Sequence, residues 1–110
     1  MTPEGRVKAK VKRRFTEAFK NSYRFMPVQN GMGAPGLDFF YCIAGLFVAI
    51  ETKAPGKNLT ERQQITASAI IGAGGLVFRV CDDDSLERAI STISHVLLTR
   101  RCQKELQHGR

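Results

Sequence analysis

The sequence has few cysteines and no long apolar run, and both shortages narrow the class of protein. Cys42, Cys81 and Cys102 are an odd number, with no C-x-x-C spacing and no nearby histidine pair. Neither a disulfide framework nor a structural zinc site is therefore expected. No stretch approaches the roughly 18 apolar residues of a membrane span, and the amino terminus has no apolar signal segment. We expect a soluble, unprocessed protein in a reducing, cytoplasmic setting, with no membrane partner.

Acidic residues are also scarce, and the excess of positive charge lies at the two ends of the chain. Seventeen Lys and Arg face ten Asp and Glu, which gives a net charge of +7. Residues 1–24 hold eight basic and two acidic groups, residues 100–110 hold four and one, and residues 25–99 hold five and seven. Basic ends suit a polyanion such as DNA, because each Lys or Arg on a phosphate releases counterions. The alternative at this point is a soluble basic protein with no such partner.

The length and composition fit a single domain with a real core. The chain has 110 residues, of which 43% are hydrophobic and 25% charged, so it is neither low in complexity nor poor in core formers. There is no internal repeat. We expect one domain over residues 1–98, followed by a loosely held basic tail over residues 99–110.

Periodicity along the chain predicts seven elements in the order α-β-β-β-α-β-α, an α/β (α+β) protein. A first helix, capped by Thr2, places apolar residues toward the core up to about residue 20, and Glu4 on the same, inward side. An extended segment over 23–28 and a glycine-rich loop over 29–36 follow. Apolar runs over 37–43 and 46–53 predict a tight hairpin turning at Ala44 and Gly45.

The second half predicts two helices around a buried strand. Thr60 opens a helix whose small residues suggest that it is packed on both sides, and a glycine pair ends it before a strand over 76–80. Ser85 is the predicted cap of a last helix that ends near residue 98. The run Asp82–Asp84 could suggest a metal cluster, but it is more simply a turn that adds favourable charge to that helix start.

Charged residues interrupt the hairpin where apolar residues are expected. Side chains alternate along a strand, so Glu51 and Lys53 share one face, and a carboxylate buried there requires a partner. Asp38 begins the facing strand, so a tight turn brings Asp38 and Glu51 to one edge of the sheet. A divalent cation would relieve their repulsion, and Lys53 would position water or stabilise charge on a phosphate. The alternative is a plain salt bridge between Glu51 and Lys53, with Asp38 as a turn residue.

Four spaced motifs resemble one nuclease family. They are GAPGLD over 33–38, FVAIETK over 47–53, LTERQ over 59–63 and GAGGLVF over 72–78. Their order and spacing resemble those of the virus-type VRR-NUC branch of the PD-(D/E)XK nucleases, from about residue 2 to residue 90. The proline that usually precedes the aspartate of this family is Leu37 here. The resemblance implies a restriction-endonuclease-like core, with a mixed central sheet flanked by helices, that hydrolyses DNA phosphodiesters with Mg²⁺ or Mn²⁺.

The resemblance also implies roles for individual residues. Asp38 and Glu51 match the metal ligands, Thr52 matches a further ligand through its backbone carbonyl, and Lys53 matches the catalytic lysine. Gln63 matches an active-site glutamine, although the spacing from Thr60 is also that of a helix capping box. Glu4 resembles the acidic residue that such nucleases carry on their first helix. Glu17, flanked by basic residues, looks instead like a solvated ion-pair partner.

The implied substrate is branched DNA, recognised by backbone shape because none of these motifs reads bases. Stand-alone proteins of this type resemble Holliday-junction resolvases, so we expect a homodimer, with the aromatic hairpin or the last helix as the interface. A phage-encoded protein of this type would act in the host cytoplasm. The alternatives are a catalytically inactive DNA-binding module and an accessory subunit. The residues expected to hold DNA phosphates on the first helix are Lys8, Lys10, Lys12, Arg13 and Arg14.

Overall fold

The computed structural model describes residues 1–28 and 36–108, and it confirms the predicted order of elements. They are α1 (Pro3–Ala18), β1 (Ser22–Phe25), β2 (Phe39–Ile43), β3 (Leu46–Thr52), α2 (Glu61–Gly72), β4 (Leu76–Val80) and α3 (Asp83–His108). The predicted loop over 29–36 falls outside the described residues except for Gly36.

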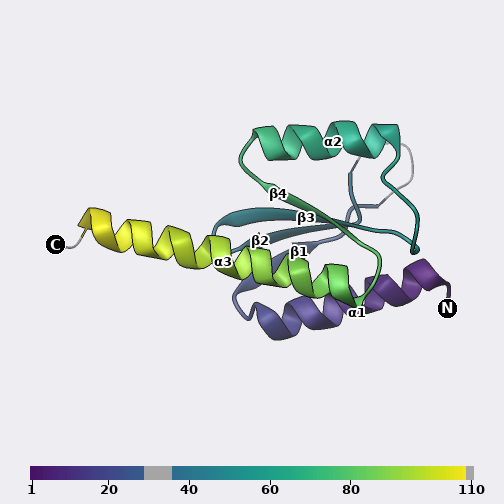
Figure 1. Ribbon diagram of the computed structural model, residues 1–110, viewed down its shortest axis with the longest axis horizontal. Helices are drawn as coiled ribbons and strands as arrows, with labels where there is room; N and C mark the ends of the chain where they lie inside the picture. The colour runs from purple at the N-terminus through teal and green to yellow at the C-terminus, as the bar shows by residue number, and fades with distance from the viewer. Residues whose placement is uncertain (29–35, 109–110) are drawn as a thin grey trace.

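The strands form one mixed sheet in the order β1-β2-β3-β4. The first three strands are antiparallel, and β4 runs parallel to β3 after the crossover through α2. Figure 1 shows α2 on one face of this sheet and α1 with α3 on the other. The mixed sheet flanked by helices confirms the predicted fold class.

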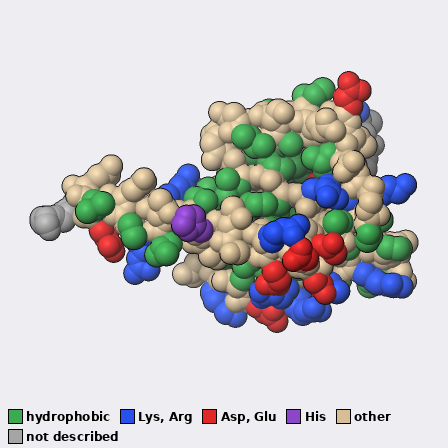
Figure 2. All heavy atoms as spheres, in the orientation of Figure 1, with side chains coloured by type: hydrophobic (Ala, Val, Ile, Leu, Met, Phe, Trp, Pro, Cys, Tyr) green, Lys and Arg blue, Asp and Glu red, His purple; other side chains and the backbone are tan. Residues whose placement is uncertain are grey.

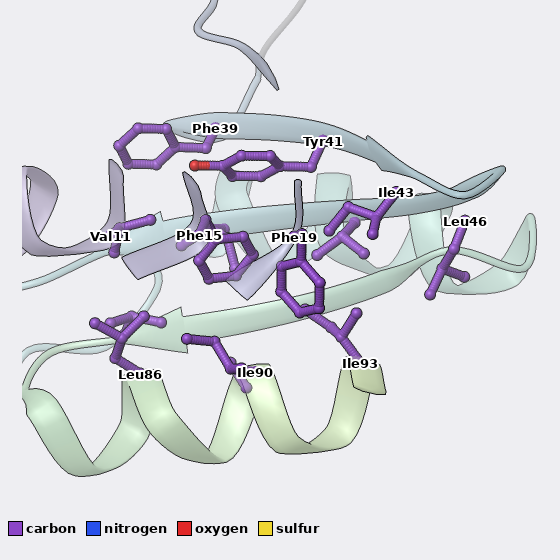
Figure 3. Close-up of a cluster of buried hydrophobic side chains, with 14 of the residues drawn as sticks. Val11, Phe15, Phe19, Phe39, Tyr41, Ile43, Leu46, Leu86, Ile90 and Ile93 are labelled. Atoms are coloured by element: carbon purple, nitrogen blue, oxygen red, sulfur yellow. The ribbon is translucent and has the colours of Figure 1, made fainter. Parts of the chain in front are cut away.

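The core lies between the sheet and the pair formed by α1 and α3. Alternate residues of β2 and β3 point to this face, and Phe15 of α1 stacks on Tyr41 with ring centroids 4.6 Å apart. Ile90 and Ile93 of α3 close the cluster from below, as Figure 3 shows. Burial of such side chains is worth about 1.5–3 kcal/mol each, so this layer fixes α1 against the sheet.

The hairpin between β2 and β3 is as tight as predicted. Ile43 pairs with Leu46 across two turn residues, Ala44 and Gly45, whose φ values are 50° and 84°. Two consecutive positive φ angles are typical of a type I′ turn, whose twist matches that of the strands. The turn sets the register, which places Asp38 opposite Glu51 at the far end of the hairpin.

Two predictions about α2 and α3 were wrong. α2 is not packed on both sides, because Ile65 and Ile71 are exposed and Ala67 is the only buried residue between Glu61 and Gly72. α3 does not end near residue 98 but continues to His108, so residues 99–108 are helical rather than a loose tail. The sequence beyond 98 loses its apolar period but consists largely of good helix formers, which explains the error.

The cap of α3 also differs from the prediction. Asp82, rather than Ser85, precedes the helix and accepts a hydrogen bond from the Ser85 backbone N–H at 2.8 Å. The Ser85 hydroxyl in turn accepts from the Asp82 backbone N–H at 3.2 Å, so the two residues cap each other. Hydrogen bonds to Asp82 Oδ1 from the Ser85 backbone N–H and from the Ser85 hydroxyl, at 2.7 Å, lower the pKa of Asp82. The acidic run therefore stabilises a helix start, as the simpler interpretation held.

The described helices include none with the length and apolar character of a membrane span. α3 extends well past the sheet toward the carboxyl terminus (Figure 1).

Candidate active site

The two predicted carboxylates meet at one edge of the sheet. Asp38 directly precedes β2, and Glu51 lies one residue before the end of β3. The register of the hairpin, in which Phe39 pairs with Ile50, brings them face to face. The Asp38 backbone N–H donates to Glu51 Oε1 at 3.1 Å, so the fold itself fixes the spacing between the two acidic residues.

The Asp38 carboxylate has a different environment at each oxygen. Oδ2 accepts hydrogen bonds from the Thr52 backbone N–H at 2.9 Å and from the Thr52 hydroxyl at 2.5 Å. Oδ1 lies 3.5 Å from Nζ of Lys8, which comes from α1. Thr52 is fully buried, so it orients Asp38 firmly, while the Lys8 ammonium is a more exposed partner.

Glu51 is a buried carboxylate with polar partners from two directions. Its Oε2 accepts a hydrogen bond from Gln63 Nε2 at 2.9 Å and lies 3.7 Å from Lys53 Nζ. The residue is only 5% exposed. Burial, and then the negative charge of Asp38, raise the pKa of Glu51 to about 7, although Lys53 opposes the shift. The site thus holds its second negative charge at a cost.

Gln63 has two structural roles at once. Its side-chain oxygen accepts from the Thr60 backbone N–H at 3.0 Å, and the Thr60 hydroxyl accepts from the Gln63 backbone N–H at 3.2 Å. This is a complete capping box at the start of α2. The amide nitrogen remains available to hold Glu51. Gln63 therefore closes the capping box and also contacts Glu51, and through this contact it anchors the start of α2 to the site.

Glu4 approaches the site without joining the acidic pair. It is half-buried near the start of α1, and its charge contributes to raising the pKa of Glu51. Within residues 1–28 and 36–108, no group of three or more His, Cys, Asp or Glu side chains comes together. The role of Glu4 as a metal ligand stays a prediction. Glu17 pairs with Arg14 at 3.3 Å on the exposed surface, as expected.

The five α1 residues predicted to hold DNA divide into three groups. Lys8 faces Asp38. Lys10 and Arg14 form ion pairs with α3, at 2.9 Å to Asp83 and 2.7 Å to Glu87; Figure 2 shows basic and acidic side chains side by side in this part of the surface. Lys12 and Arg13 are exposed, and no ion pair among the described residues involves them. Lys10 and Arg14 thus join the helices, whether or not they also contact DNA.

The residues present fit a hard divalent cation. Carboxylate and carbonyl oxygens are the donors that Mg²⁺ and Mn²⁺ prefer, and the site offers two carboxylates on a rigid strand edge. Burial, and then the charge of Asp38, disfavour the ionised form of Glu51 and raise its pKa, and a bound cation would favour the ionised form. Asp38 and Glu51 are the side chains that could hold such an ion, and the ligand roles of these carboxylates and of the Thr52 carbonyl stay predictions.

Two contacts were missed by sequence reasoning. The Thr52 hydroxyl was not assigned to Asp38, and Lys8 was assigned to DNA alone. A signal for Lys8 existed, because it follows Glu4 by four residues and so shares the side of α1 that was predicted to face inward. For Thr52, strand alternation places its side chain on the face opposite Glu51, so the sequence pattern gave no signal that its hydroxyl would donate to Asp38.

One solved structure matches the fold described above over nearly its whole length. A chain titled "VRR_NUC domain" superimposes with a TM-score of 0.70 at 20% sequence identity, and the match covers 83% of this chain and 97% of that chain. No protein-family profile matches the sequence, and no curated protein matches it. At this identity the likeness concerns the fold. The chain therefore has the fold of a VRR_NUC domain.

Proposed function

We propose that the protein is a metal-dependent, structure-selective DNA endonuclease of the VRR-NUC branch of the PD-(D/E)XK nucleases. The observation that carries the proposal is the convergence of Asp38, Glu51 and Lys53 at one sheet edge in a chain with the fold of a VRR_NUC domain. Asp38 precedes Glu51 by 13 positions and Lys53 by 15, so the three residues meet only when the hairpin folds.

Asp38, Glu51 and the Thr52 carbonyl would hold Mg²⁺ or Mn²⁺, with Glu4 as a further candidate. Such an ion, when bound, activates water and stabilises charge on a phosphate. Lys53 supplies an ammonium beside Glu51, which orients water or stabilises charge on the phosphate oxygens. Gln63 is a positioning residue: by donating to Glu51 Oε2 it orients that carboxylate from α2.

The proposed substrate is branched DNA, with a four-way junction as the leading form. Lys12 and Arg13 of α1, and the basic residues of the helical carboxyl end, are available for phosphates. Such contacts depend on backbone shape and not on base sequence. A homodimer would supply two sites for two strands, and replication or recombination of a phage genome would provide such junctions.

A cleavage assay on linear, flapped and four-way DNA tests the proposal. The wild type is expected to cut branched DNA with Mg²⁺ or Mn²⁺ and not in EDTA. Glu51→Gln and Lys53→Ala should each lower the cleavage rate by at least about 100-fold, the scale for removing a group that stabilises the transition state, while DNA binding persists. Glu105→Gln, the same chemical change on an exposed part of α3, is the matched control and should cleave normally.

Other outcomes separate the alternatives. Salt-dependent DNA binding by the wild type, with no metal-dependent cleavage of any of the three substrates, would replace the proposal with an inactive DNA-binding module. Absence of both binding and cleavage would point to an accessory subunit. If Glu51→Gln still cleaves DNA, the catalytic site lies elsewhere in the protein, and only the assignment of the fold remains.

A further inference from the structure

Lys8 occupies the open side of the candidate metal site. Its Nζ lies 3.5 Å from Asp38 Oδ1, and the Asp38 side chain is 12% exposed while that of Lys8 is 36% exposed. The other Asp38 oxygen is committed to the two hydrogen bonds from Thr52. Oδ1 is thus the oxygen that a cation can reach, and a positive group of the protein already faces it.

The position of Lys8 follows from how α1 packs on the sheet. Val7 and Val11 are buried in the core, which fixes the rotation of α1 about its axis. Lys8 then lies at the boundary of the core, one turn after Glu4, on the side that faces the acidic pair. From this position its ammonium reaches Asp38, so the packing of α1 on the sheet determines the contact.

The contact is also of a kind that can be exchanged. At 3.5 Å the ammonium forms an ion pair longer than a typical charge-assisted hydrogen bond, and its solvent exposure keeps the interaction weak. The hydrogen bonds from Thr52, by contrast, are short and buried. A divalent cation would therefore displace Lys8 and leave Asp38 in place.

We propose that Lys8 is an internal counter-cation of the metal site: it neutralises Asp38 in the metal-free protein, and a metal ion must displace it to bind. The inference rests on the proposed metal site. Its consequence is that the native protein binds metal more weakly than the two carboxylates alone would, because like charges repel near the same oxygen. Lys8 thus sets the metal affinity, in addition to any contact with DNA.

The test is metal affinity without DNA, measured by titration calorimetry with Mn²⁺. Lys8→Met keeps much of the stem and removes the charge, and we expect its Kd for Mn²⁺ to fall about 3- to 10-fold. Lys12→Met, the same change one turn later on an exposed position of α1, is the matched control and should leave the Kd unchanged. A Kd that is equal to or higher than that of the wild type in Lys8→Met would overturn the inference.

Thermal unfolding provides a second readout that does not depend on catalysis. In EDTA, Lys8→Met should unfold at a lower temperature than Lys12→Met, because the acidic pair has lost a counter-charge. Saturating Mn²⁺ should then raise its Tm by more than it raises that of Lys12→Met. An equal rise in both variants would contradict the inference alone. Failure of the wild type to bind Mn²⁺ at all would instead overturn the metal site of the proposed function.

Discussion

The buried carboxyl group of Glu51 lowers the stability of the fold, but the proposed metal site requires it. It is buried next to a second carboxylate, and its neighbours hold it in place without removing the repulsion. A well-packed apolar residue there would cost the fold less. This carboxyl group lies at a sheet edge beside a second acidic side chain and a lysine, which is the pattern expected of a functional site.

The raised pKa of Glu51 predicts that the metal-free protein loses stability as the pH rises. The pKa is about 7 in the folded state and 4.5 as the ordinary value, so between these values the unfolded state releases its proton first. The folded state binds more protons in this window, and the free energy of unfolding therefore falls with rising pH, by at most about 3 kcal/mol through this group. Denaturant unfolding in EDTA at pH 5 and pH 8 measures the loss.

Glu51→Gln is the variant that isolates this effect. It should lack the Glu51 part of the pH dependence and be more stable than the wild type at pH 8, whereas Glu105→Gln should follow the wild type. If Glu51→Gln and the wild type lose the same free energy of unfolding between pH 5 and pH 8, Glu51 is not the source of the pH dependence.

At the residue scale, the sequence predicted the contacts that lie within the hairpin and missed those that depend on a helix. Strand alternation and a two-residue turn are enough to bring Asp38, Glu51 and Lys53 together. The contact of Lys8 requires the rotation of α1 against the sheet, which the core packing decides. The capping role of Gln63 is local and was foreseen, while its bond to Glu51 needs the crossover that returns α2 over β3.

At the scale of elements, turn and cap chemistry explains where most elements begin and end. α2 ends in a Schellman motif: the Gly75 N–H donates to Ile70 O at 2.9 Å, the Gly74 N–H donates to Ile71 O at 3.0 Å, and Gly74 has a φ of 96°. The glycine pair therefore ends α2 as predicted. The end of α3 was missed because its last turns have helix-forming residues and an i,i+4 pair, Arg101 with Glu105, but no apolar period.

The hairpin turn predicts a stabilising substitution. Ala44 has a φ of 50°, a conformation that alanine adopts with strain and asparagine tolerates well. Ala44→Asn creates the Asn-Gly pair preferred in type I′ turns and should raise the free energy of unfolding by about 0.5–1 kcal/mol. Denaturant unfolding with an unchanged m-value measures the gain.

Gly45→Ala is the opposite change in the same turn. Its φ of 84° disfavours any side chain, although open space surrounds the position, so the expected loss of about 1 kcal/mol comes from the backbone alone. A loss of stability in Ala44→Asn would mean that the turn is not of type I′ in solution.

At the scale of the whole molecule, the two ends of the sheet are unlike. β1 and β4 are both edge strands, but β4 contacts α2 and α3, whereas β1 carries Tyr23 and Phe25, which are 69% and 53% exposed. Both share the α2 side of the sheet with Phe47, which is also exposed. A flat edge with exposed aromatic residues is unusual unless another chain covers it. Sequence analysis predicted the aromatic hairpin as a candidate interface, but it could not show that α2 leaves Tyr23, Phe25 and Phe47 exposed.

The last prediction is that β1 forms the contact of the proposed homodimer. Pairing of β1 with β1 of a second copy would continue the sheet and bury aromatic residues, which are the side chains that contribute most to such interfaces. Phe25→Asp should therefore raise the dimer Kd at least about 30-fold in sedimentation equilibrium, while Leu106→Asp, on the exposed far end of α3, should not.

With a net charge of +7 on each copy, added salt should strengthen the dimer and weaken DNA binding. A dimer lost in Leu106→Asp and kept in Phe25→Asp would move the contact to α3, and a wild type that stays monomeric at all concentrations would exclude it.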